Sequence, residues 1–447
     1  MNTTASVQPV AWWRPQATSR TAPAPAAAAV ANTVAFRALV AFTVILIVSP
    51  QAWFPVLGAL RIAFVAATLA IGAHLLDRIV RRDAAPPFSA EIGVALMLVA
   101  WAIITVPVSY WAGGSVEVLT SQYLKAVAFF WLVGTLATTE RRIRTIAWAL
   151  VLCAVPLAMT GLKNYLFGEV LSTGVPGFKR IYGYMGGSGI VANPNDLALM
   201  LNLTIPIAAA MMIGSRHFAA RALAALVMLL SVAGVIVTFS RAGFLTLAAT
   251  GVMLLAVLIR RHSAGAATFL IAVALIAPVL IPDGYLDRLS TITDIEADAT
   301  GSAQGRWEDV VTAAGIVTHN PIVGAGVGND MLALNEYRGR ATFRSVHNAY
   351  LQYAVDLGLP GLLLFAWLHS KCFRSARSVE RRARHDAAAR SLGPIAAGVQ
   401  VSLVTFCVAA MFHPIAYQFY FFMIGGLAVA LKQTARATPP ADEVITG

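Results

Sequence analysis

The sequence predicts an all-α, polytopic membrane protein, and two observations support this prediction. Of its 447 residues, 58% are hydrophobic and only 12% are charged, whereas an average soluble domain is about 25% charged. Hydrophobic stretches long enough to cross the hydrocarbon core of a bilayer also recur along most of the chain. A soluble enzyme, a secreted disulfide scaffold, a coiled coil and a disordered protein are therefore excluded.

About twelve segments are predicted to be transmembrane helices, followed or joined by polar loops. They are Val34–Val48, Val56–Leu76, Glu91–Tyr110, Val118–Ala137, Thr145–Leu162, Leu197–Ile213, Ala222–Thr238, Phe244–Ile259, Ala266–Ile281, Ala349–Leu368, Ile395–Phe412 and Phe419–Leu431. This predicts a disordered tail over residues 1–33, nine helices over 34–281, one large loop over 282–346, three helices over 347–431 and a tail over 432–447. No signal-peptide cleavage pattern follows the first apolar segment.

The lysines and arginines predict the orientation, because positive residues are enriched in cytoplasmic loops. With the N-terminus inside, 21 of the 33 basic residues fall on cytoplasmic segments, among them the predicted loop Lys371–Arg390. Three more fall inside spans, namely Arg37, Arg61 and Lys125. Most of the net charge of +12 therefore marks the cytoplasmic side and faces anionic lipid, so nucleic-acid binding is a poor explanation for it. We expect a multi-pass membrane protein with both ends on the cytoplasmic side.

Nine basic residues break this rule and fall on the predicted outer side. They are Lys163, Lys179, Arg180, Arg241, Arg288, Arg306, Arg338, Arg340 and Arg344. They could simply solvate the loops and pair with local acids. The alternative that we favour is a basic pocket for an anionic substrate, with Lys179, Arg180, Arg338, Arg340 and Arg344 as candidate contacts.

Arg241 stands at a junction where two apolar segments meet with almost no linker. An arginine there lies near membrane depth, where an ionisable group is costly unless it is paired, which makes it a functional candidate. A snorkelling interfacial arginine is the simpler alternative.

The large loop contains a second candidate, Arg306. Trp307, Val310, Val311, Ala314 and Val317 recur at helical spacing, which predicts an amphipathic helix ending at Asn320–Pro321. Its apolar face could lie on the membrane surface or on the helix bundle. Arg306 would be fixed at the N-terminal end of this helix.

Among the eight histidines, His347 is the candidate general base. It lies in a polar, arginine-rich segment where the large loop re-enters the membrane, next to Asn348. A neutral histidine has a reference pKa of about 6.5 and can take a proton near neutral pH. His413, which precedes Pro414 on the same side, is the rival candidate, and a helix-capping role is the simpler alternative for His347.

The sequence shows no cofactor or metal motif of convincing spacing. Asp294-Ile295-Glu296-Ala297-Asp298 could ligate a divalent cation, but a solvated acidic stretch is the preferred interpretation. Gly324-Ala325-Gly326-Val327-Gly328 follows no predicted strand and lacks nucleotide-binding spacing, so it predicts a close backbone approach. Three cysteines without metal spacing are interpreted as packing residues, namely Cys153, Cys372 and Cys407.

Together these motifs resemble the O-antigen ligase and polymerase superfamily over roughly residues 185–370. The resemblance is carried by Ser240-Arg241-Ala242-Gly243, Arg306-Trp307 with Val310, Asn320 to Gly326, His347-Asn348-Ala349-Tyr350-Leu351 and Gly358-Leu359-Pro360-Gly361. It implies transfer of a glycan from undecaprenyl pyrophosphate to an acceptor hydroxyl at the periplasmic face. In the ligases that acceptor is a sugar of lipid A–core. The resemblance also places the family's essential residues on Arg241, Arg306 and His347.

The chemistry suits these residue types. Guanidinium groups bind phosphate oxygens bidentately and stay charged at any pH, so several arginines can stabilise a pyrophosphate leaving group without a metal. His347 would take the proton of the acceptor hydroxyl. A single displacement that inverts the anomeric carbon is expected, because a retaining route needs a carboxylate at the bond and no acid adjoins the histidine or arginine motifs.

Two alternatives stay open. One is another transferase of the superfamily, either an O-antigen polymerase or a protein O-oligosaccharyltransferase, although the chain lacks the extra soluble C-terminal domain of the protein-directed enzymes. The other is a transporter or flippase of lipid-linked glycans. A transporter should show internal repeats and charges at mid-bundle. The sequence shows no repeat, its charges at that depth are limited to Arg61, Lys125 and Asp356, and its polar content concentrates on one face.

Overall fold

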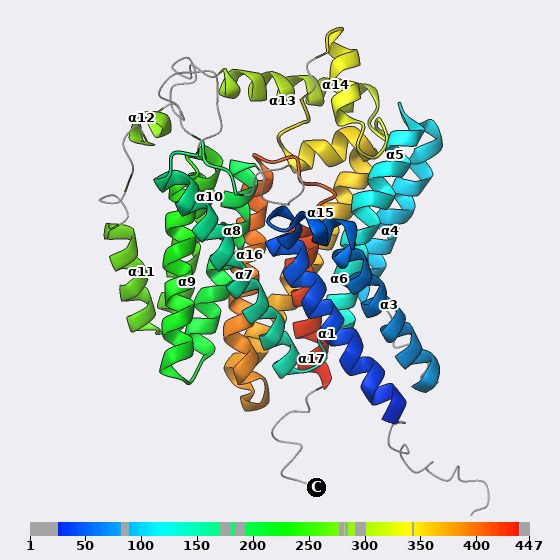
Figure 1. Cartoon of the computed structure of the whole chain (residues 1–447). Coiled ribbons are helices and arrows are strands. Elements are labelled where there is room, and N and C mark those ends of the chain that lie inside the picture. The colour runs from blue at the N-terminus through cyan, green and yellow to red at the C-terminus, as the bar shows by residue number, and fades with distance from the viewer. Residues whose placement is uncertain are drawn as a thin grey trace, which may run out of the picture.

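Long helices form the body of the molecule (Figure 1). The computed structural model describes residues 26–81, 89–169, 180–183, 193–276, 281, 285–290, 301–341 and 344–437, and among them it contains no strand. The long helices are α1 (Ala26–Val48), α3 (Ile62–Arg81), α4 (Ala90–Thr105), α6 (Leu124–Leu136), α7 (Glu140–Leu166), α8 (Pro194–Gly214), α9 (Phe218–Val237), α10 (Arg241–Arg260), α11 (Ala264–Ile276), α15 (Ala349–His385), α16 (Gly393–Ala410) and α17 (Phe419–Ala437). The remaining α-helices are α2 (Pro55–Ala59), α5 (Ala112–Val118), α12 (Tyr285–Ser290), α13 (Ser302–His319) and α14 (Asp330–Arg338).

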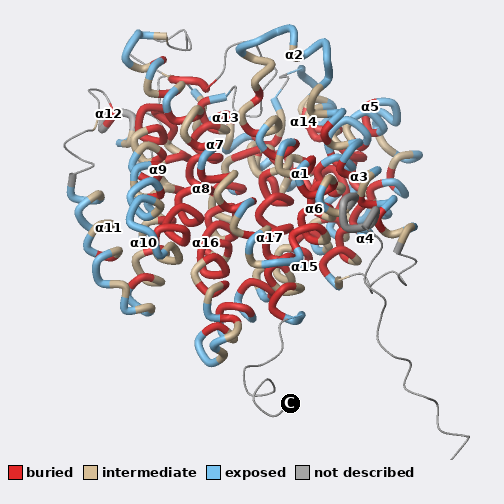
Figure 2. Tube along the Cα trace, turned by 60° about the horizontal axis from the view of Figure 1, so that its bottom comes forward, coloured by how far each residue is buried: buried red, intermediate tan, exposed pale blue. Residues whose placement is uncertain are grey.

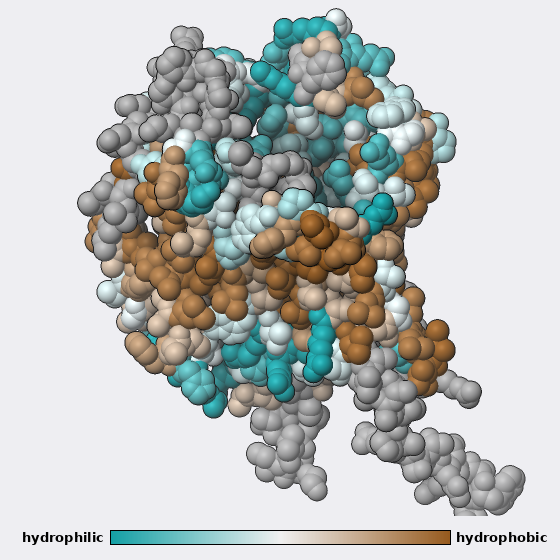
Figure 3. Space-filling model, in the orientation of Figure 1, coloured by the Kyte–Doolittle hydropathy of each residue, from teal (hydrophilic) through white to brown (hydrophobic). Residues whose placement is uncertain are grey.

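The all-helical, polytopic class is confirmed. Within the described part of the chain, nine helices are long and apolar enough to cross a membrane. Three further predicted spans coincide with α1, α11 and α17, and the count of twelve stays a prediction. Hydrophobic residues form a band across the middle of the visible face, with hydrophilic residues above and below it (Figure 3). That distribution fits a hydrocarbon layer between two aqueous phases.

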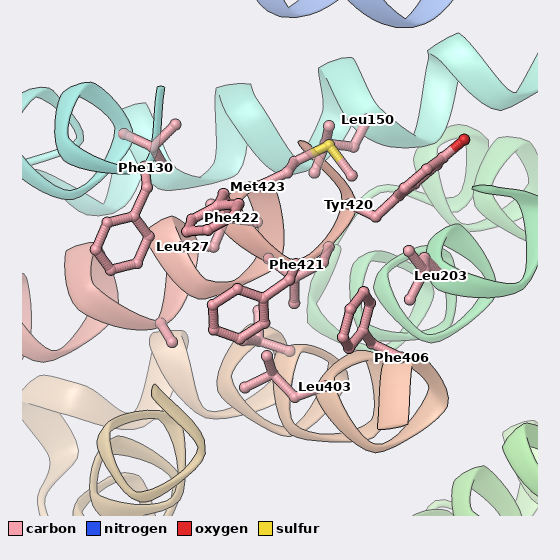
Figure 4. Packing of buried hydrophobic residues seen from close by; sticks show 14 of the residues in the cluster. Phe130, Leu150, Leu203, Leu403, Phe406, Tyr420, Phe421, Phe422, Met423 and Leu427 are labelled. Atoms are coloured by element: carbon pink, nitrogen blue, oxygen red, sulfur yellow. The ribbon is translucent and has the colours of Figure 1, made fainter. Parts of the chain in front are cut away.

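The most deeply buried helices are α8, α16 and α17, which Figure 2 shows in the interior of the bundle. Aromatic side chains fill the contacts around α17 (Figure 4). The ring centroids of Phe421 and Phe406 lie 5.6 Å apart, and those of Phe422 and Phe130 lie 6.2 Å apart. Because lipid tails are as apolar as these side chains, such close packing rather than hydrophobic burial holds membrane helices together.

One end of the bundle carries α13 and α14, and we call it the site end (Figure 1). The basic segments that mark the other side gather at the opposite end. There Arg144, near the start of α7, donates hydrogen bonds to the carbonyls of Gly214 and Ser391 at 3.2 Å each. Arg261, after α10, pairs with Glu380 of α15 at 3.2 Å. These contacts put the ends of α7, α8, α10 and α15 together, as the predicted alternation of loops requires.

Helices extend beyond three of the predicted boundaries. Helix α1 begins at Ala26, inside the predicted disordered tail, and α17 continues to Ala437 beyond the predicted last span. The basic segment Lys371–Arg390, predicted as a loop, is helical to His385 and then forms a 3₁₀ turn. A helix does not stop where it leaves the apolar layer, and ion pairs between residues four apart, such as Arg384 with Glu380 at 2.8 Å, stabilise such an extension.

Helix α15 has a sharp kink at Gly358, where φ is 67° and ψ is −174°. The glycine loop 324–328 packs against this kink, as its sequence predicted. Ala325 N donates to Val355 O at 2.7 Å and Gly326 N donates to Asp356 O at 2.8 Å. The kink therefore separates a short first segment of α15, which carries the loop contacts and begins beside His347, from the long segment that crosses the bundle.

Replacing Gly358 by alanine should destabilise the protein. A Cβ at this position would lie 2.2 Å from Ile322 O, and the positive φ strains any L-residue. We expect a cost of about 1–3 kcal/mol, measured as a lower melting temperature in detergent. Gly251→Ala in α10 is the matched control, because a Cβ there meets no atom within 4 Å. Equal melting temperatures for the two variants would contradict the prediction.

Candidate active site

The helix predicted in the large loop is present as α13, which lies across the site end of the bundle (Figure 1). Its buried positions are Gly305, Asp309, Thr312, Ala313 and Ile316. They differ from the apolar face that the sequence predicted, of which Trp307 and Val311 are exposed. Polar Asp309 and Thr312 face inward because Arg338 of α14 pairs with both side chains.

A cleft of about 260 Å³ lies beneath the N-terminal half of α13. It is lined by the three predicted catalytic residues, although they are far apart in sequence: Arg241 begins α10, Arg306 lies on α13 and His347 precedes α15. The remaining walls are apolar, formed by Ala242, Leu245, Ala303, Trp307, Val310, Met411 and Phe412. Two guanidinium groups and an imidazole thus share a small, largely apolar space.

Arg241 is held by a tight junction between α9 and α10. Only Thr238, Phe239 and Ser240 connect the two helices, and Phe239 has a positive φ of 55°. Ser240 Oγ accepts a hydrogen bond from Gly243 N at 3.0 Å and so caps α10. The positive end of the α10 dipole therefore adds to the guanidinium charge, which favours an anion at this point.

Arg180 lies close to Arg241 and is anchored by Asn195. Its guanidinium donates to Asn195 Oδ1 at 3.2 Å, and Ser240 Oγ donates to the same oxygen at 2.7 Å. Burial and the neighbouring Arg241 lower the pKa of Arg180, and Asp196 partly opposes this shift. Arg180 Nε is buried and has no hydrogen-bond partner among the described residues. Two like charges held this closely, with a donor to spare, favour binding of a multiply charged anion.

His347 faces a buried carboxylate. Its Nδ1 lies 3.7 Å from Asp309 Oδ2, and neither atom has a hydrogen-bond partner within the described part of the chain. Asp309 is only 1% exposed, whereas the His347 side chain is 32% exposed and lines the cleft. Burial raises the Asp309 pKa, but His347 and Arg338 outweigh burial and hold this pKa below its ordinary value.

The expectation that no acid adjoins the histidine is therefore wrong. Asp309 lies three residues after Arg306, on the same side of a helical turn, and that spacing was the available signal. The carboxylate does not line the cleft, because Asp309 Oδ1 accepts a hydrogen bond from Arg338 at 2.9 Å and Oδ2 faces His347. It is thus placed to orient the imidazole rather than to attack a substrate.

The other predicted substrate contacts have different surroundings. Arg338 is 6% exposed and pairs with Asp309, and Arg340 is 60% exposed and pairs with Glu308. Asn348 Oδ1 caps α15 by accepting from Tyr350 N at 3.0 Å and Leu351 N at 3.1 Å. The capping role that the sequence left open for His347 therefore belongs to its neighbour.

Arg344 packs against the start of α13. A Cβ on Gly305 would lie 1.9 Å from the Arg344 guanidinium. Because glycine has no side chain, the guanidinium can approach α13 at the residue next to Arg306. Arg344 therefore stays near the cleft without lining it. Lys179 and the acidic stretch 294–298 lie outside the described residues.

His413, the rival base, is buried beneath the cleft and is 2% exposed. Its Nδ1 lies 2.7 Å from Ala409 O and its Nε2 lies 3.1 Å from Asn195 O. Burial, together with the nearby Arg306 and His347, lowers its pKa to about 4, although the two carbonyls oppose the shift. The neutral imidazole can donate to only one of these two carbonyls, but it is buried between them and cannot reach a substrate, so the geometry favours His347 as the base.

Asp330 was not singled out from the sequence, yet it fixes the segment before His347. Its Oδ2 accepts hydrogen bonds from Ser345 Oγ and from Val346 N, the latter at 2.7 Å. Burial raises the pKa of this carboxyl, and these hydrogen bonds oppose the shift. Within the described ranges, no group of three or more histidine, cysteine or acidic side chains is arranged to hold a metal ion.

Comparison with known families agrees with the motif order. Residues 201–366 match a family model described as O-antigen ligase, which confirms the resemblance inferred over roughly residues 185–370. The matched region includes Arg241, Arg306 and His347. No curated protein gives a significant match to the chain.

Proposed function

We propose, from the premise that residues 201–366 carry an O-antigen ligase domain, that this protein is an O-antigen ligase. It transfers a glycan from undecaprenyl pyrophosphate to a sugar hydroxyl of lipid A–core at the periplasmic face of the inner membrane. The observation that carries the proposal is the cleft shared by Arg241, Arg306 and His347. Two cations for a leaving pyrophosphate and one base for an incoming hydroxyl are the groups that this reaction needs.

In the proposed step, the acceptor hydroxyl gives its proton to His347 Nε2 while its oxygen attacks the anomeric carbon. The bond from that carbon to the pyrophosphate oxygen breaks, and the oxygen keeps the electron pair. Arg241 and Arg306, with Arg180 behind Arg241, stabilise the negative charge that develops there. The products are the glycosylated acceptor and undecaprenyl pyrophosphate. Because no carboxylate stands among the described residues that line the cleft, we infer inversion at the anomeric carbon.

The assay that tests this proposal supplies purified lipid-linked glycan, either with lipid A–core or with no second acceptor. Glycan on lipid A–core is the expected product. A lengthened lipid-linked glycan in the absence of lipid A–core would instead assign the protein as a polymerase. Recovery of unreacted donor in both reactions would overturn the transferase assignment.

We further propose that Asp309 is a positioning residue for His347. Its carboxylate, held by Arg338, directs Nδ1 and leaves Nε2 for the acceptor proton, and it stabilises the imidazolium that forms. The distance of 3.7 Å is long for a hydrogen bond, but such contacts often tighten only when substrate is bound.

Asp309→Asn should lower kcat about 10–100-fold and leave the KM for lipid-linked donor nearly unchanged. Glu308→Gln is the matched control, since Glu308 is adjacent on α13 and, like Asp309, lies near Arg338, at 3.8 Å, but pairs with Arg340 and not with His347. A purely structural role would change the amount of folded protein and leave kcat per folded molecule at the wild-type value.

Metal chelation should leave transfer unaffected. In the proposed mechanism arginines supply the positive charge that a divalent cation supplies in many phosphate-handling enzymes. The measurement is the initial rate with and without excess chelator. Loss of activity that returns on adding a divalent cation would contradict the arginine mechanism and favour the acidic stretch 294–298 as a metal site.

A further inference from the structure

A second, larger cleft opens between α1, α3 and α6, on a different side of the bundle from α10 and α11 (Figure 1). Its volume is about 630 Å³, within the usual range for a site that holds a lipid or other small ligand. Its walls are mainly apolar and include Phe42, Leu46, Phe64, Phe129 and Phe419. We call it the lateral groove.

The lateral groove faces the bilayer because α3 is mostly exposed. The buried positions of α3 are Ala66, Ala70, His74 and Asp77, spaced so that they form one narrow stripe. The rest of the helix presents apolar side chains outward, such as Phe64, which is 66% exposed. In Figure 2 the tube of α3 is correspondingly pale over much of its length. A lipid molecule can therefore enter the groove sideways from the membrane.

Two cations line this apolar groove, Arg61 and Lys125. Both are exposed, and neither has an ion-pair partner among the described residues. No acidic side chain stands among the residues that line the groove. Unpaired cations beside apolar walls are costly at membrane depth unless an anion joins them, so the groove is complementary to an apolar chain that carries a negative group.

The backbone has an unusual conformation beside each of these two cations. Arg61 has a φ of 47°, a strained conformation for an arginine, at the turn where α3 begins. Helix α6 is preceded by a π-helical turn over Leu119–Tyr123, a distortion that often occurs at functional sites. Both Ser121 of this turn and Lys125 line the groove, as does Gln51, whose Oε1 is buried without a hydrogen-bond partner. Polar side chains thus lie beside the two cations of the groove.

The lateral groove is also close to the candidate active site. Phe419 lines the groove, and Phe412 lines the catalytic cleft. Seven residue steps separate them, which span at most about 25 Å of chain. The connection is rigid, because Tyr417 between them packs its ring 5.1 Å from Tyr123 and donates to Asp356 at 2.9 Å. A lipid seated in the groove could therefore present an attached saccharide to His347.

From this geometry we propose that the lateral groove binds the lipid-anchored acceptor, with Arg61 and Lys125 on a phosphate of its lipid part and the apolar walls on an acyl chain. The proposal rests on the proposed transferase function. The donor's pyrophosphate is assigned to Arg241 and Arg306, so a second membrane-anchored substrate needs a second place from which its hydroxyl reaches the same cleft. A phosphorylated lipid matches the two unpaired cations, whereas an uncharged lipid would leave them unpaired.

The test compares wild-type protein with the double variant Arg61→Gln, Lys125→Gln in phosphatidylcholine nanodiscs. The acceptors are lipid A–core and the same lipid after enzymatic removal of its lipid A phosphates. We expect the double variant to raise the KM for the phosphorylated acceptor about 10–30-fold, with kcat and the donor KM unchanged. The dephosphorylated acceptor should have the same KM with both proteins. Arg78→Gln, at the other end of α3, is the matched control and should behave like wild type.

Two outcomes would overturn the lateral groove as the acceptor site. One is an unchanged KM for the phosphorylated acceptor in the double variant. The other is equal competition by phosphatidylglycerol, which would assign the groove to bulk anionic phospholipid. A direct readout separates this proposal from the transferase function: native mass spectrometry should show fewer bound phosphorylated lipid molecules on the double variant. If wild-type protein transfers no glycan but still binds that lipid through these cations, the transferase function fails and the groove remains as a phospholipid site.

Discussion

His347→Ala should abolish glycan transfer while the protein stays folded and still binds lipid-linked glycan. The imidazole lines the cleft, and the structure offers no substitute base there, because His413 is buried with both nitrogens against backbone carbonyls. General-base catalysis is worth about 10²–10⁴-fold, so the expected loss of kcat is of that order. The measurement is single-turnover transfer with saturating donor and acceptor, alongside equilibrium binding of the donor.

His319→Ala is the matched control for this variant. His319 also lies in the large loop, at the exposed end of α13, where its Nδ1 contacts Gly315 O and its ring packs against Tyr337, away from the cleft. It should turn over like wild type. Undiminished transfer by His347→Ala would remove the base assignment, and loss of donor binding would show that the imidazole serves the leaving group instead.

Arg241→Ala should lower kcat/KM for the donor about 10²–10³-fold, the usual effect of removing one group that stabilises a developing anion. Arg306→Ala should have an effect of the same order, since both guanidinium groups line the cleft. Arg241→Lys should recover only part of the loss, because an ammonium keeps the charge but cannot bind two phosphate oxygens in one plane. The measurement is the donor titration, repeated with free undecaprenyl pyrophosphate as competitor.

Arg260→Ala is the control for this pair, because Arg260 ends the same helix that Arg241 begins and lies at the opposite end of the bundle. It should leave the donor titration unchanged. If Arg241→Ala transferred glycan at the wild-type rate and bound the competitor with wild-type affinity, the arginine would be an interfacial anchor and not a pyrophosphate ligand.

The fold class could be predicted from the sequence because the membrane imposes a simple rule: only long apolar stretches cross it. The ends of helices were harder. The basic segment Lys371–Arg390 looked like a loop since charge marks the membrane boundary, yet ion pairs continue the helix to His385. Similarly, the apolar spacing over α13 predicted a helix but not which of its faces is buried. The buried face depends on Arg338, which lies on α14 and pairs with Asp309.

The sequence could predict the catalytic residues that line the cleft, but not the residues that hold them in place. Arg241 stood out because it interrupts an apolar context, and Arg306 and His347 because they lie at the start of a predicted amphipathic helix and where the large loop re-enters the membrane. Asp309 and Asp330 did not, because nine acids share the large loop and sequence alone cannot tell which of them is buried. Only the packing of α13 and α14 against the start of α15 shows that Asp309 faces His347 and that Asp330 holds the segment before it.

The position of Asn195 at the start of α8 has a consequence for how this site can change. One residue receives Arg180 and Ser240 on its side-chain oxygen and lies against His413 through its carbonyl. Three chain segments therefore share a single anchor, and the energetic effects of substitutions among them are not additive. A substitution at Arg180, Ser240 or His413 is therefore constrained by the other two residues. The pair Arg180 and Arg241 and the junction between α9 and α10 can diversify only together.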